Sequence, residues 1–143
     1  MTISIINGPN LNRLGKRNPE FYGSETFEET LEAIRNRFKG IDIRYFQSNS
    51  EGEIIDIIQR ENLDNSVAGI IINPGAYAHY SYAIADAIED SDKPVIEVHI
   101  SNIHAREEFR AKSVTARAAS AVIAGCGRNG YSLAVEYLAS TSL

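Results

Sequence analysis

Short apolar runs alternate with longer amphipathic stretches along the chain, and this alternation dominates its hydrophobic pattern. The apolar runs have the length and the β-branched content of strands. They cover residues 2–7, 41–47, 67–73, 95–101 and 121–125. The amphipathic stretches repeat apolar residues every three to four positions, as helices do. We expect helices over residues 26–38, 50–58, 81–89 and 131–139, and a short helical turn over residues 105–109.

Strands that alternate with helices form a parallel sheet covered on both faces, because right-handed crossovers pack each helix against the sheet. A chain of 143 residues fits one domain, residues 1–143. The commonest strand order at this size is 2-1-3-4-5. We therefore predict an α/β fold, a flavodoxin-like three-layer sandwich around a five-stranded parallel sheet.

Ionisable residues interrupt the fourth apolar run, where a buried strand should have none. Glu97, His99 and Ser101 occupy alternate positions, so a strand period of two places them on one face. They approach the carboxyl end of the strand, where open parallel sheets bind ligands. Asn10 and Asn73 follow the first and third strands. The predicted strand order makes Asn10, Asn73 and His99 converge.

Charge and composition narrow the class of partner. The formal net charge is −5, with acids and bases interspersed and no basic cluster, so we expect no nucleic-acid partner. No apolar run is long enough to span a membrane. One cysteine, Cys126, excludes an internal disulfide, and together with the absence of a signal-like start it favours a cytoplasmic location. We expect a small metabolite or another protein as partner.

Two patterns suggest a cofactor or a metal, and we reject both. Residues 125–130, Gly-Cys-Gly-Arg-Asn-Gly, match the dinucleotide pattern G-x-G-x-x-G. That fingerprint belongs to a first βαβ unit with an acidic residue about 20 positions on, whereas only one helix follows here, so we interpret the glycines as a tight turn. The three histidines, His79, His99 and His104, do not stand at a metal-ligand spacing.

The remaining polar residues near the strand ends form a set suited to proton transfer. Arg17 and Tyr22 lie in a long polar loop after the first strand, and Arg110 lies beyond the fourth. A tyrosinate can remove a proton, and amides can hold an oxyanion directly or through water. An imidazole backed by a carboxylate can donate a proton. The set therefore indicates an enzyme.

Several of these residues belong to longer motifs. The motifs are Asn7-Gly8-Pro9-Asn10-Leu11-Asn12, Gly15-Lys16-Arg17, Tyr22-Gly23, Gln47-Ser48-Asn49, Glu51-Gly52, Ile72-Asn73-Pro74-Gly75-Ala76-Tyr77 with His79, Glu97-Val98-His99-Ile100-Ser101-Asn102 and His104-Ala105-Arg106-Glu107-Glu108-Phe109-Arg110. In this order and spacing they resemble the motifs of type II 3-dehydroquinate dehydratase. The resemblance runs from the first strand to Gly130-Tyr131, which is nearly the whole chain.

The resemblance implies a flavodoxin-like subunit that uses no cofactor and assembles as a homo-oligomer, a dodecamer built as a tetramer of trimers. It implies a lyase that eliminates water from 3-dehydroquinate in the anti sense, through an enolate, to give 3-dehydroshikimate. This step serves the shikimate pathway, as the third step of chorismate biosynthesis, and also quinate catabolism. The sequence leaves both roles open.

By position, the resemblance also implies a role for each residue of the set. Tyr22 is the base at C2, Arg17 keeps it ionised, and Asn10 holds the water that stabilises the enolate. His99, oriented by Glu97, protonates the departing C1 hydroxyl. The substrate-binding residues are Asn73, Ile100 and Ser101 for the carboxylate, His79 and Arg110 for ring hydroxyls, and Asp86 from a neighbouring subunit.

A hypothesis from another class stays open beside the lyase. A catalytically idle flavodoxin-like binding subunit that kept the pocket would carry the same residues. Turnover of 3-dehydroquinate by the purified protein discriminates between the two, because only the lyase forms the enone of 3-dehydroshikimate.

Overall fold

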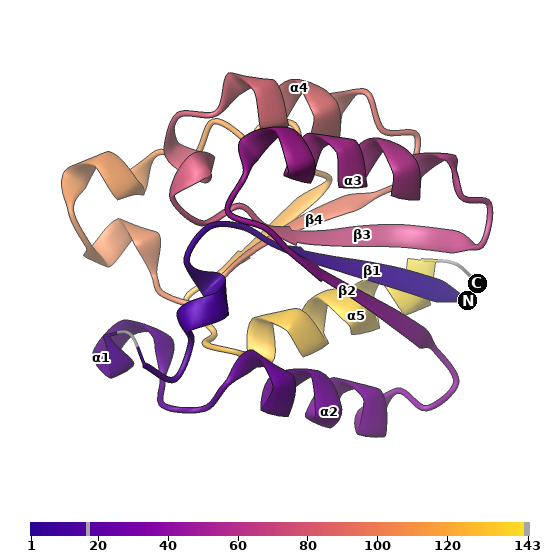
Figure 1. Ribbon diagram of the computed structural model, residues 1–143, viewed down its shortest axis with the longest axis horizontal. Helices are drawn as coiled ribbons and strands as arrows, with labels where there is room; N and C mark the ends of the chain where they lie inside the picture. The colour runs from indigo at the N-terminus through magenta and orange to yellow at the C-terminus, as the bar shows by residue number, and fades with distance from the viewer. Residues whose placement is uncertain (17, 142–143) are drawn as a thin grey trace.

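A parallel sheet of five strands forms the middle layer of the fold (Figure 1), and its order is β2-β1-β3-β4-β5, as predicted. The computed structural model describes residues 1–16 and 18–141. The strands are β1 (Thr2–Asn7), β2 (Asp42–Gln47), β3 (Val67–Asn73), β4 (Val95–His99) and β5 (Ala121–Ala124). Neighbouring strands pair in parallel throughout. The predicted flavodoxin-like sandwich is confirmed.

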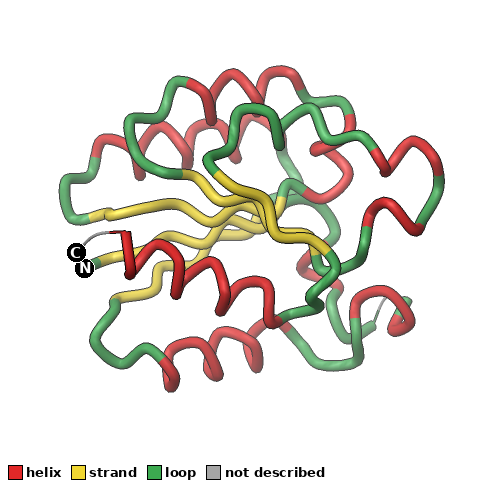
Figure 2. The backbone as a smooth tube through the Cα atoms, turned by 180° about the vertical axis from the view of Figure 1, so that it is seen from behind, coloured by secondary structure: helices red, strands yellow, loops and turns green. Residues whose placement is uncertain are grey.

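Helices cover both faces of this sheet. The α-helices of the described residues are α1 (Pro19–Tyr22), which lies outside the sheet, and α2 (Phe27–Arg37), α3 (Glu51–Leu63), α4 (Tyr82–Glu89) and α5 (Asn129–Thr141). Helices α3 and α4 lie on one face, and α2 and α5 lie on the other (Figures 1 and 2). Thr26, Ser50 and Ser81 cap three of them, because each hydroxyl accepts a hydrogen bond from the backbone N–H three residues on.

Alternate residues of the central strands pack against the two helical layers. Ile5 and Ile71 belong to the core that includes residues of α2 and α5. Ile6, Ile70 and Ile72 belong to the core that includes residues of α3 and α4. All five side chains are fully buried. Because both faces are covered, these strands are continuous apolar runs rather than alternating ones.

The fourth strand is shorter than predicted. β4 ends at His99, whereas Ile100 and Ser101 were expected to continue it. β5 ends at Ala124, and the backbone N–H groups of the following turn bond to this part of the chain, Gly125 to His99 (3.2 Å) and Gly127 to Ile100 (3.0 Å). The ladder thus ends with β5, and the chain bends at the pocket.

Two further local predictions need correction. The helical turn expected over residues 105–109 is replaced by two 3-10 turns, Ile103–Ala105 and Glu108–Ala111. The long polar loop expected after the first strand contains a 3-10 turn, Leu11–Arg13, and the helix α1. The short helix α4 packs against the core through Ile84 and Ile88.

A buried chain of hydrogen bonds joins the carboxyl ends of β1 and β3 to helix α5. The Tyr131 hydroxyl donates to Asn7 Oδ1 (2.8 Å) and accepts from Asn73 Nδ2 (2.9 Å). Asn7 Nδ2 donates to the Tyr45 hydroxyl (3.3 Å), and Gly75 N donates to Asn73 Oδ1 (3.1 Å). Burial raises the pKa of the Tyr131 phenol far above its usual value, so this hydroxyl stays a donor. Both ends of the Asn73 amide are thereby fixed.

We predict that Tyr131→Phe destabilises the fold by about 1–3 kcal/mol, because it removes the hydroxyl that bonds to the buried Asn7 Oδ1 and Asn73 Nδ2. Urea denaturation of the two proteins measures the difference. Tyr137→Phe is the matched control, since it removes a hydroxyl from a side chain of the same helix that is 46% exposed. Equal midpoints for wild type and Tyr131→Phe would contradict the prediction.

Candidate active site

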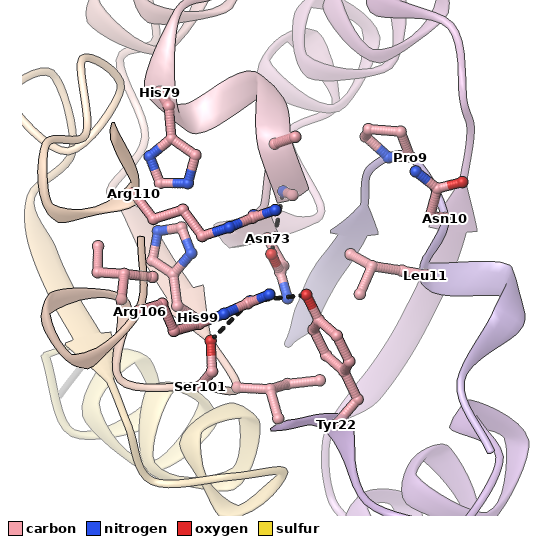
Figure 3. Close-up of a pocket in the computed structure, with 14 residues that line it drawn as sticks. Pro9, Asn10, Leu11, Tyr22, Asn73, His79, His99, Ser101, Arg106 and Arg110 are labelled. Atoms are coloured by element: carbon pink, nitrogen blue, oxygen red, sulfur yellow. Dashed lines mark hydrogen bonds between the residues drawn. The ribbon is translucent and has the colours of Figure 1, made fainter. Parts of the chain in front are cut away.

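A pocket lies at the carboxyl ends of β1, β3 and β4, where the sequence predicted a ligand site (Figure 3). Eight predicted site residues line it, namely Asn10, Tyr22, Asn73, His79, His99, Ile100, Ser101 and Arg110. The predicted convergence of Asn10, Asn73 and His99 is confirmed. The cavity volume is about 40 Å³, which holds only a few water molecules. A ligand with a six-membered ring is larger than this space, so lining side chains must move to admit it.

The carboxylate of Glu97 lies directly behind His99. Glu97 is fully buried, and its Oε2 lies 2.8 Å from His99 Nε2. Ser113 Oγ donates to the same oxygen (2.7 Å), and the Thr115 hydroxyl donates to Oε1. A buried charge is tolerated only when it is paired and hydrogen-bonded in this way. The sequence placed Glu97 and His99 on one face, and this is confirmed.

The hydrogen bond to Glu97 fixes the orientation of the His99 ring. Because a carboxylate only accepts, Nε2 is the donor, and Nδ1 is the nitrogen left for a ligand. His99 is 5% exposed, and the pocket is the route by which a ligand can reach its ring. The ring is thus held in the way that a proton donor needs.

Tyr22, the last residue of α1, reaches the pocket from the other side (Figure 3). Its hydroxyl accepts a hydrogen bond of 2.8 Å from Arg106 Nη1, which also donates to Ser101 Oγ (3.3 Å). The Arg106 guanidinium lies 4.4 Å from the ring centroid of Phe21 and 5.3 Å from that of Tyr22. A cation therefore contacts the oxygen that was predicted to act as a base.

Sequence reasoning missed Arg106 as a site residue. It belongs to the motif that runs from His104 to Arg110, but nothing in the sequence distinguishes its direction from that of Arg110. Ser113 and Thr115 were missed as well, because they lie in a stretch without periodicity. Arg17, predicted to keep Tyr22 ionised, lies outside the described residues.

His79 faces the pocket as a neutral ring. Its Nδ1 lies 2.8 Å from the carbonyl oxygen of Lys112, which can only accept. Burial lowers the pKa of His79, although this hydrogen bond opposes the shift, so the neutral form dominates near pH 7. The ring stacks at 6.3 Å from that of His99 and meets the Phe109 ring edge-on. His79 Nε2 is then an acceptor, suited to a hydroxyl group.

The remaining predicted residues lie at the edge of the pocket or away from it. Asn10 has left-handed backbone angles (φ 69°), and its N–H donates to Asn49 Oδ1 (3.0 Å). Arg110 pairs with Glu107. Asp86 lies on the outer face of α4, in a separate depression that Lys112 and Arg117 also line. The structure therefore does not bring Asp86 into the pocket of its own chain.

In the described part of the chain, no group of three or more His, Cys, Asp or Glu side chains is arranged to hold a metal ion. Its helices also include none with the length and apolar character needed to cross a membrane. The polar side chains of the pocket are those described above.

Comparison with known proteins is consistent over the whole chain. A sequence model of the family described as dehydroquinase class II matches residues 1–139. A 3-dehydroquinate dehydratase of Thermotoga neapolitana is 51% identical over 144 aligned positions, covering 99% of this chain and 97% of that protein. One from Clostridium beijerinckii is 53% identical, covering 96% and 95%.

Solved structures of type II dehydroquinases have the same fold as this chain. The type II dehydroquinase from Butyrivibrio crossotus superposes with a TM-score of 0.93 at 48% identity and covers 97% of each chain. The type II dehydroquinase from Propionibacterium acnes superposes with a TM-score of 0.91 at 42% identity, covering 97% of this chain and 96% of that one. The chain therefore belongs to the class II dehydroquinase family.

Proposed function

We propose that this chain eliminates water from 3-dehydroquinate, with Tyr22 as base and His99 as acid. The dehydratase class follows from the family and from relatives that share half of the sequence. The observation that carries the residue assignment is the pairing of these two groups across one pocket. The Tyr22 hydroxyl contacts a guanidinium at 2.8 Å, and His99 contacts a buried carboxylate at the same distance.

The first step removes the proton at C2 of the substrate. Tyr22 Oη accepts this proton, and the electron pair of the C–H bond moves to the C3 carbonyl, giving an enolate. The guanidinium of Arg106 stabilises a negative charge on Oη before the transfer. We assign the same role to Arg17, as the family resemblance implies. Asn10 holds the water that donates to the enolate oxygen.

The second step expels the hydroxyl group at C1. The enolate collapses to form the C1–C2 double bond, and His99 donates a proton to the leaving oxygen, so that water departs. His99 must carry protons on both nitrogens to do this, and the Glu97 carboxylate supports the resulting positive charge. The product is 3-dehydroshikimate. This step is common to aromatic biosynthesis and quinate catabolism.

The other pocket residues bind the substrate in this proposal. Asn73, Ile100 and Ser101 hold the carboxylate, and His79 and Arg110 bind ring hydroxyls. Their support is that all five line the pocket. The Asn73 amide cannot flip, because its oxygen accepts a hydrogen bond from Gly75 N. Its Nδ2 group is therefore the part that faces the ligand as a donor.

Purified protein is predicted to convert 3-dehydroquinate with a rise in near-ultraviolet absorbance, because the product is an enone. Tyr22→Phe keeps the ring but removes the base, so turnover should fall by roughly 10²–10⁴-fold while the thermal midpoint stays close to that of wild type. Tyr137→Phe should turn over like wild type. Absence of turnover by wild-type protein over a broad pH range would favour the idle binding subunit.

Glu97→Gln should lower kcat by roughly 10²-fold, because an amide cannot support a protonated His99. Glu61→Gln is a matched control. Glu61 is also a buried carboxylate at 2% exposure, and it bonds to Ser4 Oγ (2.6 Å) and Arg44 (3.2 Å). Steady-state kinetics and thermal unfolding of both variants separate chemistry from stability. Comparable kcat losses in the two variants would argue against a catalytic role for Glu97.

We also propose that the chain acts as a homo-oligomer, a dodecamer of four trimers, in which Asp86 completes the pocket of a neighbouring subunit. Its support is the family resemblance and the position of Asp86 on the outer face of α4, away from its own pocket. Light scattering should then give a mass near twelve times 15.8 kDa.

A subunit-mixing experiment tests the role of Asp86. Asp86→Ala and Tyr22→Phe should each be nearly inactive alone. After unfolding and refolding together, mixed oligomers contain pockets with Tyr22 from one subunit and Asp86 from another, so part of the activity should return. A mixture no more active than the separate variants would contradict the proposal.

A further inference from the structure

We infer that Arg128 is a positioning residue that holds Tyr22 in place through its backbone; this inference rests on the proposed role of Tyr22 as the base. Arg128 belongs to the Gly-Cys-Gly-Arg-Asn-Gly turn of residues 125–130, which otherwise has no assigned function. It reaches the segment from Tyr22 to Thr30, which is about a hundred residues away in sequence.

The guanidinium of Arg128 makes four hydrogen bonds to this segment. Nη2 and Nε both donate to the carbonyl oxygen of Tyr22, at 2.9 and 3.2 Å. Nη1 donates to the carbonyl oxygen of Thr26 (2.9 Å) and to Thr30 Oγ1 (3.1 Å). One rigid planar group thus joins the end of α1 to the beginning of α2. A lysine has no such fork of donors.

Burial supports a positioning role for this cation. The side chain of Arg128 is only 12% exposed, and its closest carboxylate, that of Glu25, lies 4.0 Å away. Burial lowers the pKa of Arg128, against the opposing effect of the Glu25 and Glu29 carboxylates. A desolvated guanidinium that bonds mainly to carbonyl groups fixes geometry rather than neutralising charge. Four of its five N–H donors bond to the segment from Tyr22 to Thr30, so the guanidinium has little left to offer a phosphate group.

The segment that carries Tyr22 needs such an attachment. Helix α1 has four residues, too few to be stable alone. It is followed by Gly23, whose φ of 79° lies in the left-handed region, and the Gly23 N–H bonds back to the Pro19 carbonyl (2.9 Å). A Cβ at Gly23 would lie 3.4 Å from Arg128 Nε, which is an ordinary contact. The glycine is therefore required by its left-handed φ rather than by the approach of Arg128.

The other end of Arg128 is fixed to the strand that carries His99. Gly125 N and Gly127 N donate to the carbonyl oxygens of His99 and Ile100 (3.2 and 3.0 Å). Both glycines have positive φ, 87° and 60°, which the turn requires. Hydrogen bonds therefore attach the turn at both ends, to the backbone of His99 and Ile100 through its glycines and to the backbone of Tyr22 through the side chain of Arg128. Arg128 sets the position of the proposed base relative to the proposed acid.

Arg128→Met removes the four hydrogen bonds and keeps much of the bulk. We expect kcat to fall roughly tenfold to a hundredfold, because a small displacement of a reacting group is enough for such a loss, while KM changes little. The kcat of Arg128→Lys should lie between those of wild type and Arg128→Met, since one ammonium group can still reach the Tyr22 carbonyl. Millimolar guanidinium should restore part of the kcat of Arg128→Ala.

The control and a readout besides activity make the test decisive. Arg35→Met also removes an arginine bond to a backbone carbonyl, that of Ile43 (2.8 Å), from helix α2, and should keep wild-type kcat. Hydrogen exchange of the amides of residues 19–26 should be roughly tenfold faster in Arg128→Met than in wild type or Arg35→Met. This readout stays valid even if the proposed reaction is wrong, in which case wild-type protein shows no turnover.

Two results would overturn the inference. One is an Arg128→Met variant with wild-type kcat and wild-type exchange over residues 19–26. The other is an Arg35→Met variant that also loses kcat and exchange protection, with losses in both variants that follow the drop in thermal midpoint. Arg128 would then act only through the overall stability of the fold.

Discussion

The buried carboxylate of Glu97 is the constraint on which the rest of the site depends. A charge inside the sheet without partners would be unfavourable by several kcal/mol, and the fold compensates it with His99 on the same strand and with Ser113 and Thr115 from elsewhere. The latter two lie on the segment that returns from the pocket to β5. Hydrogen bonds to this one carboxylate therefore constrain the path of that irregular segment, and the imidazole is held by a buried strand of the sheet.

The proposed base is held in a different way from the proposed acid. Tyr22 belongs to a four-residue helix outside the sheet, and arginines fix it at two points, Arg106 at its hydroxyl and Arg128 at its carbonyl. Arginine side chains can move far more readily than strands. With a cavity of about 40 Å³, side chains that line the pocket must move before a larger ligand fits. A movement of the Arg106 side chain alone would leave both the core and the attachment of the Tyr22 backbone to Arg128 undisturbed.

The sequence was sufficient for the sheet and for the centre of the site, because both depend on repeating patterns. Period-two placement predicted the contact of Glu97 with His99, and strand order predicted the approach of Asn73. Arg106 and Ser113 could not be predicted in this way, since residues 102–120 contain only 3-10 turns and loops, where tertiary contacts decide the direction of a side chain. The glycine-rich turn was recognised, but the glycines alone accounted for its shape, so the function of Arg128 within it stayed hidden.

The hydrogen bonds of Tyr131 have a consequence for the order in which the site can form. Asn7 and Asn73 come from strands near the beginning and the middle of the chain, yet the hydroxyl that joins their amides comes from helix α5. During synthesis, the ribosome releases the amino-terminal part first. A nascent chain that already contains every strand still lacks the group that orients Asn73. The proposed binding site therefore reaches its final geometry only when α5 docks, after the whole sheet has been synthesised.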